Sequence, residues 1–156
     1  MSLRKEILYA FAERLRTITV ANGYPLDLGT VFGVDKKTPL SLNLEPHEMP
    51  AIIVIDEVDD PQDEKGMVDS AWAVRLQLID SGEKMDGEML DLCEIVGRCL
   101  ISNSFTAEVI DGWRSMHPRI YRLQRGRIDS DLNMIEANRI YSMQWTIHYR
   151  AKQFEF

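Results

Sequence analysis

Cysteine is scarce in this 156-residue chain, which has only Cys93 and Cys99. The two lie six residues apart in a segment with helical periodicity, so they point to different faces, too far apart for an easy disulfide. We therefore expect reduced thiols rather than a disulfide-stabilised scaffold. No apolar run approaches the ~18 residues of a membrane span. The opening residues mix both charge signs, unlike a signal peptide, so we expect a cytoplasmically made protein with no membrane partner.

Positive charge is also in short supply. The chain has 18 Lys and Arg against 25 Asp and Glu, which gives a formal net charge of −7. Tight binding of nucleic acid needs basic side chains that neutralise phosphates, so this balance disfavours it. Arginines nevertheless gather between residues 114 and 127, after a more acidic middle of the chain. Such asymmetry suits contact between protein subunits of opposite local charge.

Motifs that carry chemistry are absent from the sequence. It has no Gly-x-Ser-x-Gly elbow and no glycine-rich phosphate loop, and the segment 29–33 lacks the third glycine of a dinucleotide fingerprint. His47, His117 and His148 are scattered, with no cysteine near them at zinc-ligand spacing. We therefore expect no cofactor and no metal, and a protein that is not an enzyme.

Hydrophobic residues, in contrast, make up 45% of the chain, enough at this length for one folded domain over residues 1–156. Apolar residues recur every three or four positions from Leu3 to Ala21, which predicts an amphipathic first helix. Polar residues, Arg14 among them, are assigned to its other faces. Asn22-Gly23 then supplies the left-handed stop that helices favour.

Two stretches predict neighbouring strands in the middle of the chain. Residues 51–55 are apolar on both strand faces, which indicates a strand buried at the centre of a sheet. Apolar and polar residues alternate over 68–78, which predicts a strand with one face toward solvent. The connection over 56–66 is acidic and contains Pro61, so we expect an antiparallel hairpin with a long loop. A short strand is expected earlier, over 30–34.

The second half of the chain predicts one more helix and two more strands. Apolar residues over 85–100 follow helical spacing. Strict alternation over 141–149 is the clearest strand pattern in the sequence, and residues 119–128 form a further strand able to pair with it through a polar loop over 129–136. This order of elements predicts an α+β fold, a mostly antiparallel β-sheet covered by two main α-helices.

The acidic stretch over 56–65 is a candidate for a divalent-cation site, because hard cations bind carboxylate oxygens. Its spacing does not fit an EF-hand, since Pro61 falls where glycine is needed and Met67 falls at the bidentate position. Asp63-Glu64-Lys65 matches half of a metal-dependent nuclease site, but such a site needs ligands on rigid strands. A solvated surface loop is the favoured interpretation, and a metal-dependent hydrolase or nuclease is the alternative.

Trp113 follows a glycine and precedes Arg114 in a turn-like setting. An exposed Trp beside Arg is typical of interface hot spots, whereas burial of the ring is the alternative and is favoured. The strand over 119–127 is also a docking element for the third possibility, a small protein-binding adaptor. The candidates for contact with other proteins are Asp56, Asp59, Asp60, Asp63, Glu64, Trp113, Arg114, Arg122, Arg125 and Arg127.

The order of elements resembles the tail-terminator and tail-completion (minor tail) proteins of long-tailed bacteriophages. The likeness covers nearly the whole chain. It rests on the first helix ending at Asn22-Gly23-Tyr24-Pro25, the segment Val31-Phe32-Gly33, the strand Met49-Pro50-Ala51-Ile52-Ile53-Val54 with its acidic continuation, the long hairpin, the second helix and the closing aromatic strand from Tyr141 to Tyr149.

This resemblance implies a structural protein of a phage or prophage tail, which caps the tail tube and presents a surface to the head. The implied partners are further copies of the chain in a ring, typically a hexamer, the tail-tube protein and a head-completion protein, with DNA at most passing through the lumen. The implied location is the host cytoplasm during assembly and then the virion tail. The acidic stretch could face the lumen or the tube, where its charge would repel DNA and ease its passage.

Overall fold

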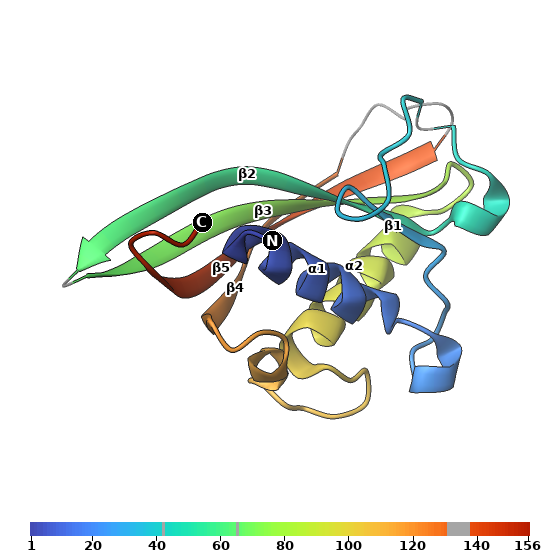
Figure 1. Ribbon diagram of the computed structural model, residues 1–156. Coiled ribbons are helices and arrows are strands. Elements are labelled where there is room, and N and C mark those ends of the chain that lie inside the picture. Colours follow the sequence, from blue (N-terminus) through green and yellow to red (C-terminus); the bar gives the residue numbers. More distant parts are fainter. Residues whose placement is uncertain (42, 65, 131–137) are drawn as a thin grey trace.

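The computed structural model of the chain describes residues 1–41, 43–64, 66–130 and 138–156. It has one five-stranded sheet in the order β1-β2-β3-β5-β4 and two α-helices, which confirms the predicted α+β fold (Figure 1). Strands β1 and β2 are parallel, and the other neighbours are antiparallel. The elements, with η marking short 3-10 helices, are α1 (Leu3–Arg16), η1 (Val20–Asn22), β1 (Thr30–Phe32), η2 (Pro46–Glu48), β2 (Ala51–Glu64), β3 (Met67–Ser81), α2 (Asp86–Ser102), η3 (Gly112–Ser115), β4 (Ile120–Ser130) and β5 (Asn138–Lys152).

Strand β2 differs most from expectation. Its pairing with β3 continues past a β-bulge at Glu57 to Glu64, so the prediction of a long acidic loop is wrong. The backbone ladder pairs the peptide groups that face β3, and this tertiary context overrides the low strand propensity of Asp and Pro. Strand β2 is central only over residues 51–53, where β1 pairs with it. Farther along, β2 is an edge strand, a position that tolerates Pro61.

Helix α1 begins where Ser2 caps it, its Oγ accepting a hydrogen bond from the Lys5 backbone N–H at 3.2 Å. The helix ends at Arg16, earlier than the predicted end at Ala21, and the 3-10 turn η1 follows. Gly23, with φ of 92°, is the left-handed cap of η1 rather than of α1. A 14-residue α-helix and a 3-residue 3-10 turn, joined by a bend, replace the single longer helix that the periodicity predicted.

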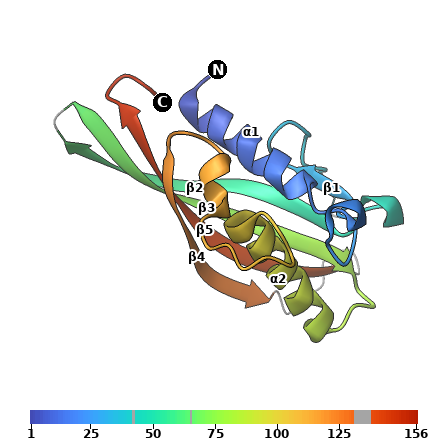
Figure 2. The ribbon, with the colours of Figure 1, turned by 90° about the horizontal axis from the view of Figure 1, so that it is seen from below.

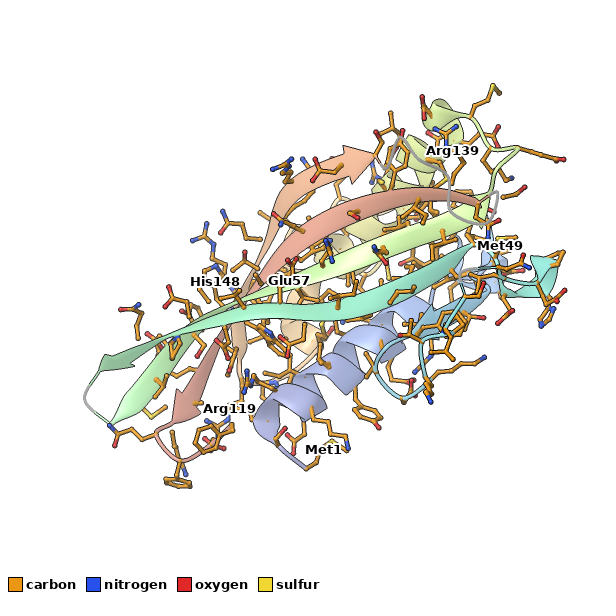
Figure 3. The ribbon with its side chains drawn as sticks, turned by 90° about the horizontal axis from the view of Figure 1, so that it is seen from above. Met1, Met49, Glu57, Arg119, Arg139 and His148 are labelled. Atoms are coloured by element: carbon orange, nitrogen blue, oxygen red, sulfur yellow. The ribbon has the colours of Figure 1, made fainter. Side chains whose placement is uncertain are left out.

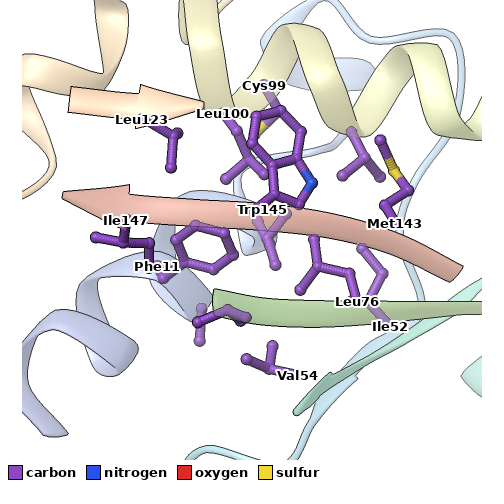
Figure 4. Packing of buried hydrophobic residues seen from close by; sticks show 14 of the residues in the cluster. Phe11, Ile52, Val54, Leu76, Cys99, Leu100, Leu123, Met143, Trp145 and Ile147 are labelled. Carbon is purple, nitrogen blue, oxygen red and sulfur yellow. The ribbon is translucent and has the colours of Figure 1, made fainter. Parts of the chain in front are cut away.

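Both helices lie against the same face of the sheet and cover the main core (Figure 2). Trp145 of β5 is fully buried between the sheet and α2, with Leu76 of β3 and Phe11 of α1 close by (Figure 4). Burial of each large apolar side chain contributes about 1.5–3 kcal/mol to folding. The predicted alternation of β5 is confirmed, because its buried side chains include Tyr141, Met143, Trp145, Ile147 and Tyr149.

The other face of the sheet is covered only in part (Figure 3). A small apolar cluster lies at one end, where the connection between β1 and β2 reaches it; its buried members are Phe32, Leu44, Ala51, Ile53, Ile79 and Ile140. We call this side the outer face. At the opposite end, the tips of β2 and β3 project past both helices (Figure 1). The predicted loop over 129–136 begins as strand at Asp129 and Ser130, and its remainder lies outside the described residues.

Candidate interaction surfaces

The part of β2 over residues 56–60, which we call the acidic edge, has β3 on one side and no other described strand beside it. Asp59 stands opposite Trp72, a residue of the helix-covered face, and its neighbour Asp60 therefore belongs to the outer face. Asp56 accepts a hydrogen bond from Nε1 of Trp72 at 2.7 Å. The carboxylates of the acidic edge thus alternate between the two faces of the sheet.

Asp59 is the most enclosed of these carboxylates. Its Oδ2 accepts a hydrogen bond from the Tyr149 hydroxyl at 2.5 Å and lies 3.7 Å from Nη1 of Arg4. Its other oxygen, Oδ1, is buried and has no hydrogen-bond partner in the described part of the chain. Burial, and then the hydrogen bond to Asp59, raise the pKa of Tyr149 to about 12. The Tyr149 phenol therefore stays protonated and donates to the Asp59 carboxylate.

A cavity of about 620 Å³ opens beside this pair, between the start of α1, the outer part of β2 and β3, and the chain after β5. Charged side chains of both signs and two aromatic side chains line it, among them Arg4, Asp59, Tyr149, Gln153, Glu155 and Phe156. Glu155 also accepts a hydrogen bond from Nη2 of Arg119 at 3.2 Å. The cavity is therefore an open, mixed-charge hollow at the base of the projecting hairpin.

The strand conformation of the acidic stretch bears on the metal-site alternative. Its carboxylates stand on a rigid element rather than a loop, which removes one argument against ion binding. Their alternation between the two faces of the sheet is a new argument against ion binding, because neighbouring carboxylates point in opposite directions. Within the described ranges, no three His, Cys, Asp or Glu side chains gather as a metal site would require. The side chains of Asp63 and Glu64, and Lys65 altogether, lie outside the described residues.

Trp113 lies in η3, and its side chain is buried, which confirms the burial alternative over the exposed hot spot. The Arg114 guanidinium carbon lies 5.2 Å from the ring centroid of Trp113, and its Nε donates to Oδ2 of Asp111 at 3.1 Å. Only the Arg114 half of this candidate pair is exposed. Any partner would therefore contact Arg114 and not the indole ring.

Arg14 was assigned to a polar face of the first helix, and this assignment is wrong. The side chain is buried, and its guanidinium donates to the Gly112 carbonyl at 3.0 Å and to Oγ of Ser115 at 2.8 Å. A Cβ on Gly112 would lie 2.4 Å from the carbonyl carbon of Ser102, so only glycine fits there. Arg14 thus ties α1 to η3 across about a hundred residues of chain.

Strand β4 carries the arginine candidates and forms the opposite edge of the sheet; we call residues 122–127 the basic edge. Arg122 stands opposite His148 on the outer face, and Arg125 stands opposite Trp145 on the helix-covered face. Arg127 pairs with Asp129 at 2.8 Å. Burial, and then the charge of Arg122, lower the pKa of His148. Neither Arg122 nor Arg125 forms an ion pair with another described residue.

A groove of about 520 Å³ runs along the basic edge between α2 and β4. Leu90, Ile110 and Ile128 in its lining remain 51%, 84% and 37% exposed, so this edge combines cationic and apolar surface. The acidic and basic edges do not meet within one chain, because β3 and β5 separate them by roughly 14 Å at ordinary strand spacing.

Comparison of the chain with protein-family models and with curated protein sequences found no match. The likeness to tail terminators therefore stays a prediction drawn from the order of elements. Among the described helices, none combines the length and apolar character that a bilayer crossing demands.

Proposed function

We propose that this chain is a structural subunit of a bacteriophage or prophage tail, which caps the tail tube and forms the head-tail joining surface without catalysis. The observation that carries the proposal is the layout of the candidate residues. Asp56, Asp59 and Asp60 follow one edge of the sheet, and Arg122 and Arg125 follow the other. Residues spread along two opposite edges suit contact with neighbouring proteins rather than conversion of one small molecule.

The projecting hairpin supports the same proposal. Its strands continue past the helices, and Val58 within it is 63% exposed although it stands in the middle of a long strand. An edge strand of this length is an association hazard for a protein that works alone. In an assembly, the same hairpin offers contact area to a neighbour. A ring that closes the end of a tube needs contact surfaces of this kind and no cofactor.

The test is to mix the purified full-length chain with tubes assembled from the tail-tube protein encoded near it, and to image them by electron microscopy. We expect the chain at one end of each tube only, and tubes that stop lengthening once it is bound. Glu83→Ala, at an exposed position away from both edges, provides a control that should still cap. Decoration along the tube wall, or continued growth of tubes in an excess of the chain, would contradict the proposal.

A further inference from the structure

Building on the proposed ring, we infer that the acidic edge of one copy binds the basic edge of a second copy. The contact is heterologous, because it uses two different surfaces. After one contact, the first copy still has its basic edge free and the second its acidic edge, so further copies can join at both ends. The occupant of the basic edge is thus another molecule of this chain, recognised by the carboxylates of residues 56–60. This places those carboxylates between copies rather than toward the lumen.

Charge decides which edges can meet. The acidic edge has four carboxylates, Asp56, Glu57, Asp59 and Asp60, and the basic edge has three arginines, Arg122, Arg125 and Arg127. Two acidic edges repel each other, and so do two basic edges, which disfavours symmetric dimers through either edge. The pairing of unlike edges is attractive. It also provides partners for Arg122 and Arg125, which have no ion pair within the described part of the chain.

The strand directions and the faces of the sheet agree with this pairing. Because β2, β3, β5 and β4 alternate in direction, a second copy that extends the sheet with the same face upward brings its β2 antiparallel to β4. In that arrangement, a register with Arg122 of one copy beside Asp60 of the other puts both side chains on the outer face. The same register sets Arg125 beside the Asp56–Glu57 step, where Asp56 shares the helix-covered face. Both faces of the junction are then complementary at once.

Bulges and charges on edge strands usually prevent association, and this chain has both. The bulge at Glu57 ends the regular run of β2, and the bulges of β4 fall on either side of the segment 122–125. The segment between them is regular, so a short run of contact remains open. The charges block only like edges. These devices therefore select one pairing and do not abolish all of them.

Apolar side chains at both edges supply contact area that charge alone would not. Val58 lies in the middle of the acidic edge and is 63% exposed. The groove beside the basic edge presents Leu90, Ile110 and Ile128 to solvent. Burial of such surface stabilises a complex, whereas the charged pairs fix its orientation and raise its rate of formation. The association should accordingly weaken, but not vanish, as salt is added.

The test uses two charge-reversed variants of the full-length chain in analytical ultracentrifugation at low salt. Glu57→Lys with Asp60→Lys reverses the charge at two of the four acidic-edge positions and spares Asp56 and Asp59, which accept hydrogen bonds from Trp72 and Tyr149. Arg122→Glu with Arg125→Glu reverses the basic edge. We expect the unaltered chain to associate and each variant alone to sediment at the 18.0 kDa mass of the monomer. An equimolar mixture of the two variants should associate again, because every junction between them joins unlike charges.

Glu13→Lys with Glu83→Lys is the matched control for the acidic-edge variant, because it makes the same change in net charge at exposed positions on α1 and in the turn before α2, and it should associate like the unaltered chain. Circular dichroism checks that each variant is folded, and the milder pair Arg122→Gln and Arg125→Gln should weaken association at least about tenfold. An unaltered chain that stays monomeric at millimolar concentration, or a mixture that stays monomeric, overturns the inference. Capping of tubes by a chain whose reversed variants still form rings refutes this contact and leaves the proposed function intact.

Discussion

Replacing Arg14 by Met tests the largest departure of the core from its predicted pattern. The methionine side chain fills much of the same space but cannot donate the two hydrogen bonds that reach Gly112 and Ser115. The change therefore separates the packing of this residue from its polar contacts. If those contacts hold η3 against α1, their loss should loosen η3 before the rest of the domain.

The expected loss in free energy of unfolding is about 2 kcal/mol. A hydrogen bond from a charged donor contributes about 1.5–3 kcal/mol, and Arg14 donates two. Two effects reduce the sum. Burial lowers the pKa of Arg14, so the charged guanidinium already carries a desolvation cost that Met removes. The Gly112 carbonyl also keeps a second donor, the Ser115 hydroxyl at 3.1 Å, and is not left bare.

Urea denaturation followed by tryptophan fluorescence measures this loss, and a melting temperature lower by roughly 4–8 °C should accompany it at this chain length. Hydrogen exchange over residues 112–116 should accelerate more than exchange in β3. Arg127→Met is the matched control, since Arg127 is exposed and its ion pair within the described ranges is a surface contact with Asp129, worth about 0–1 kcal/mol. Equal stability of Arg14→Met and the unaltered chain would refute the reasoning, because no buried bond could then be supporting η3.

Three further outcomes are expected. Gly112→Ala should lower the free energy of unfolding by about 1–3 kcal/mol in the same assay, because its Cβ would press on the backbone of Ser102, whereas Gly87→Ala, with open space around it, should not. Because the pKa of Tyr149 is raised from 10.0 to about 12 in the folded chain, its protonated phenol contributes to stability fully below pH 10.0, and this contribution is lost as the pH rises to about 12. The free energy of unfolding of Tyr149→Phe should therefore fall less over that pH range than that of the unaltered chain. Titration with Mg²⁺ or Mn²⁺ should give no heat and no rise in melting temperature; a saturable rise would favour the hydrolase alternative.

The strands that period-two patterns predicted correctly are those with one face under the helices. In β3 and β5, alternate side chains pack beneath α1 and α2, so the buried positions appear in the sequence as apolar residues at every second position. The second half of β2 has no such pattern. It is held by its ladder with β3 and by contacts such as the hydrogen bond from Trp72 to Asp56, which come from another part of the chain. The local sequence pattern of this segment therefore predicts a loop.

The candidate surfaces likewise include positions that the local sequence predicts and contacts that it does not. Runs of acidic and basic residues identified Asp60 and Arg122 as surface positions, because charge without apolar neighbours rarely goes inside. The sequence did not reveal that Asp59 meets Tyr149, since ninety residues separate them. Arg14 differs from these positions. It falls at the helical spacing set by Ile7, Phe11 and Ile18, so the periodicity predicts the buried face, whereas its charge predicts a polar face.

Four carboxylates in five consecutive positions of one strand repel one another, and specific contacts with other residues hold them there. Trp72 donates to Asp56, Nε of Arg75 lies 3.9 Å from Oε1 of Glu57, and Tyr149 donates to Asp59, whereas Oδ1 of Asp59 is buried and has no donor among the described residues. A strand kept under this strain at an open edge gains nothing for the isolated chain. It is intelligible if a neighbour's arginines complete the edge, since the same charges that destabilise one copy then decide how two copies join.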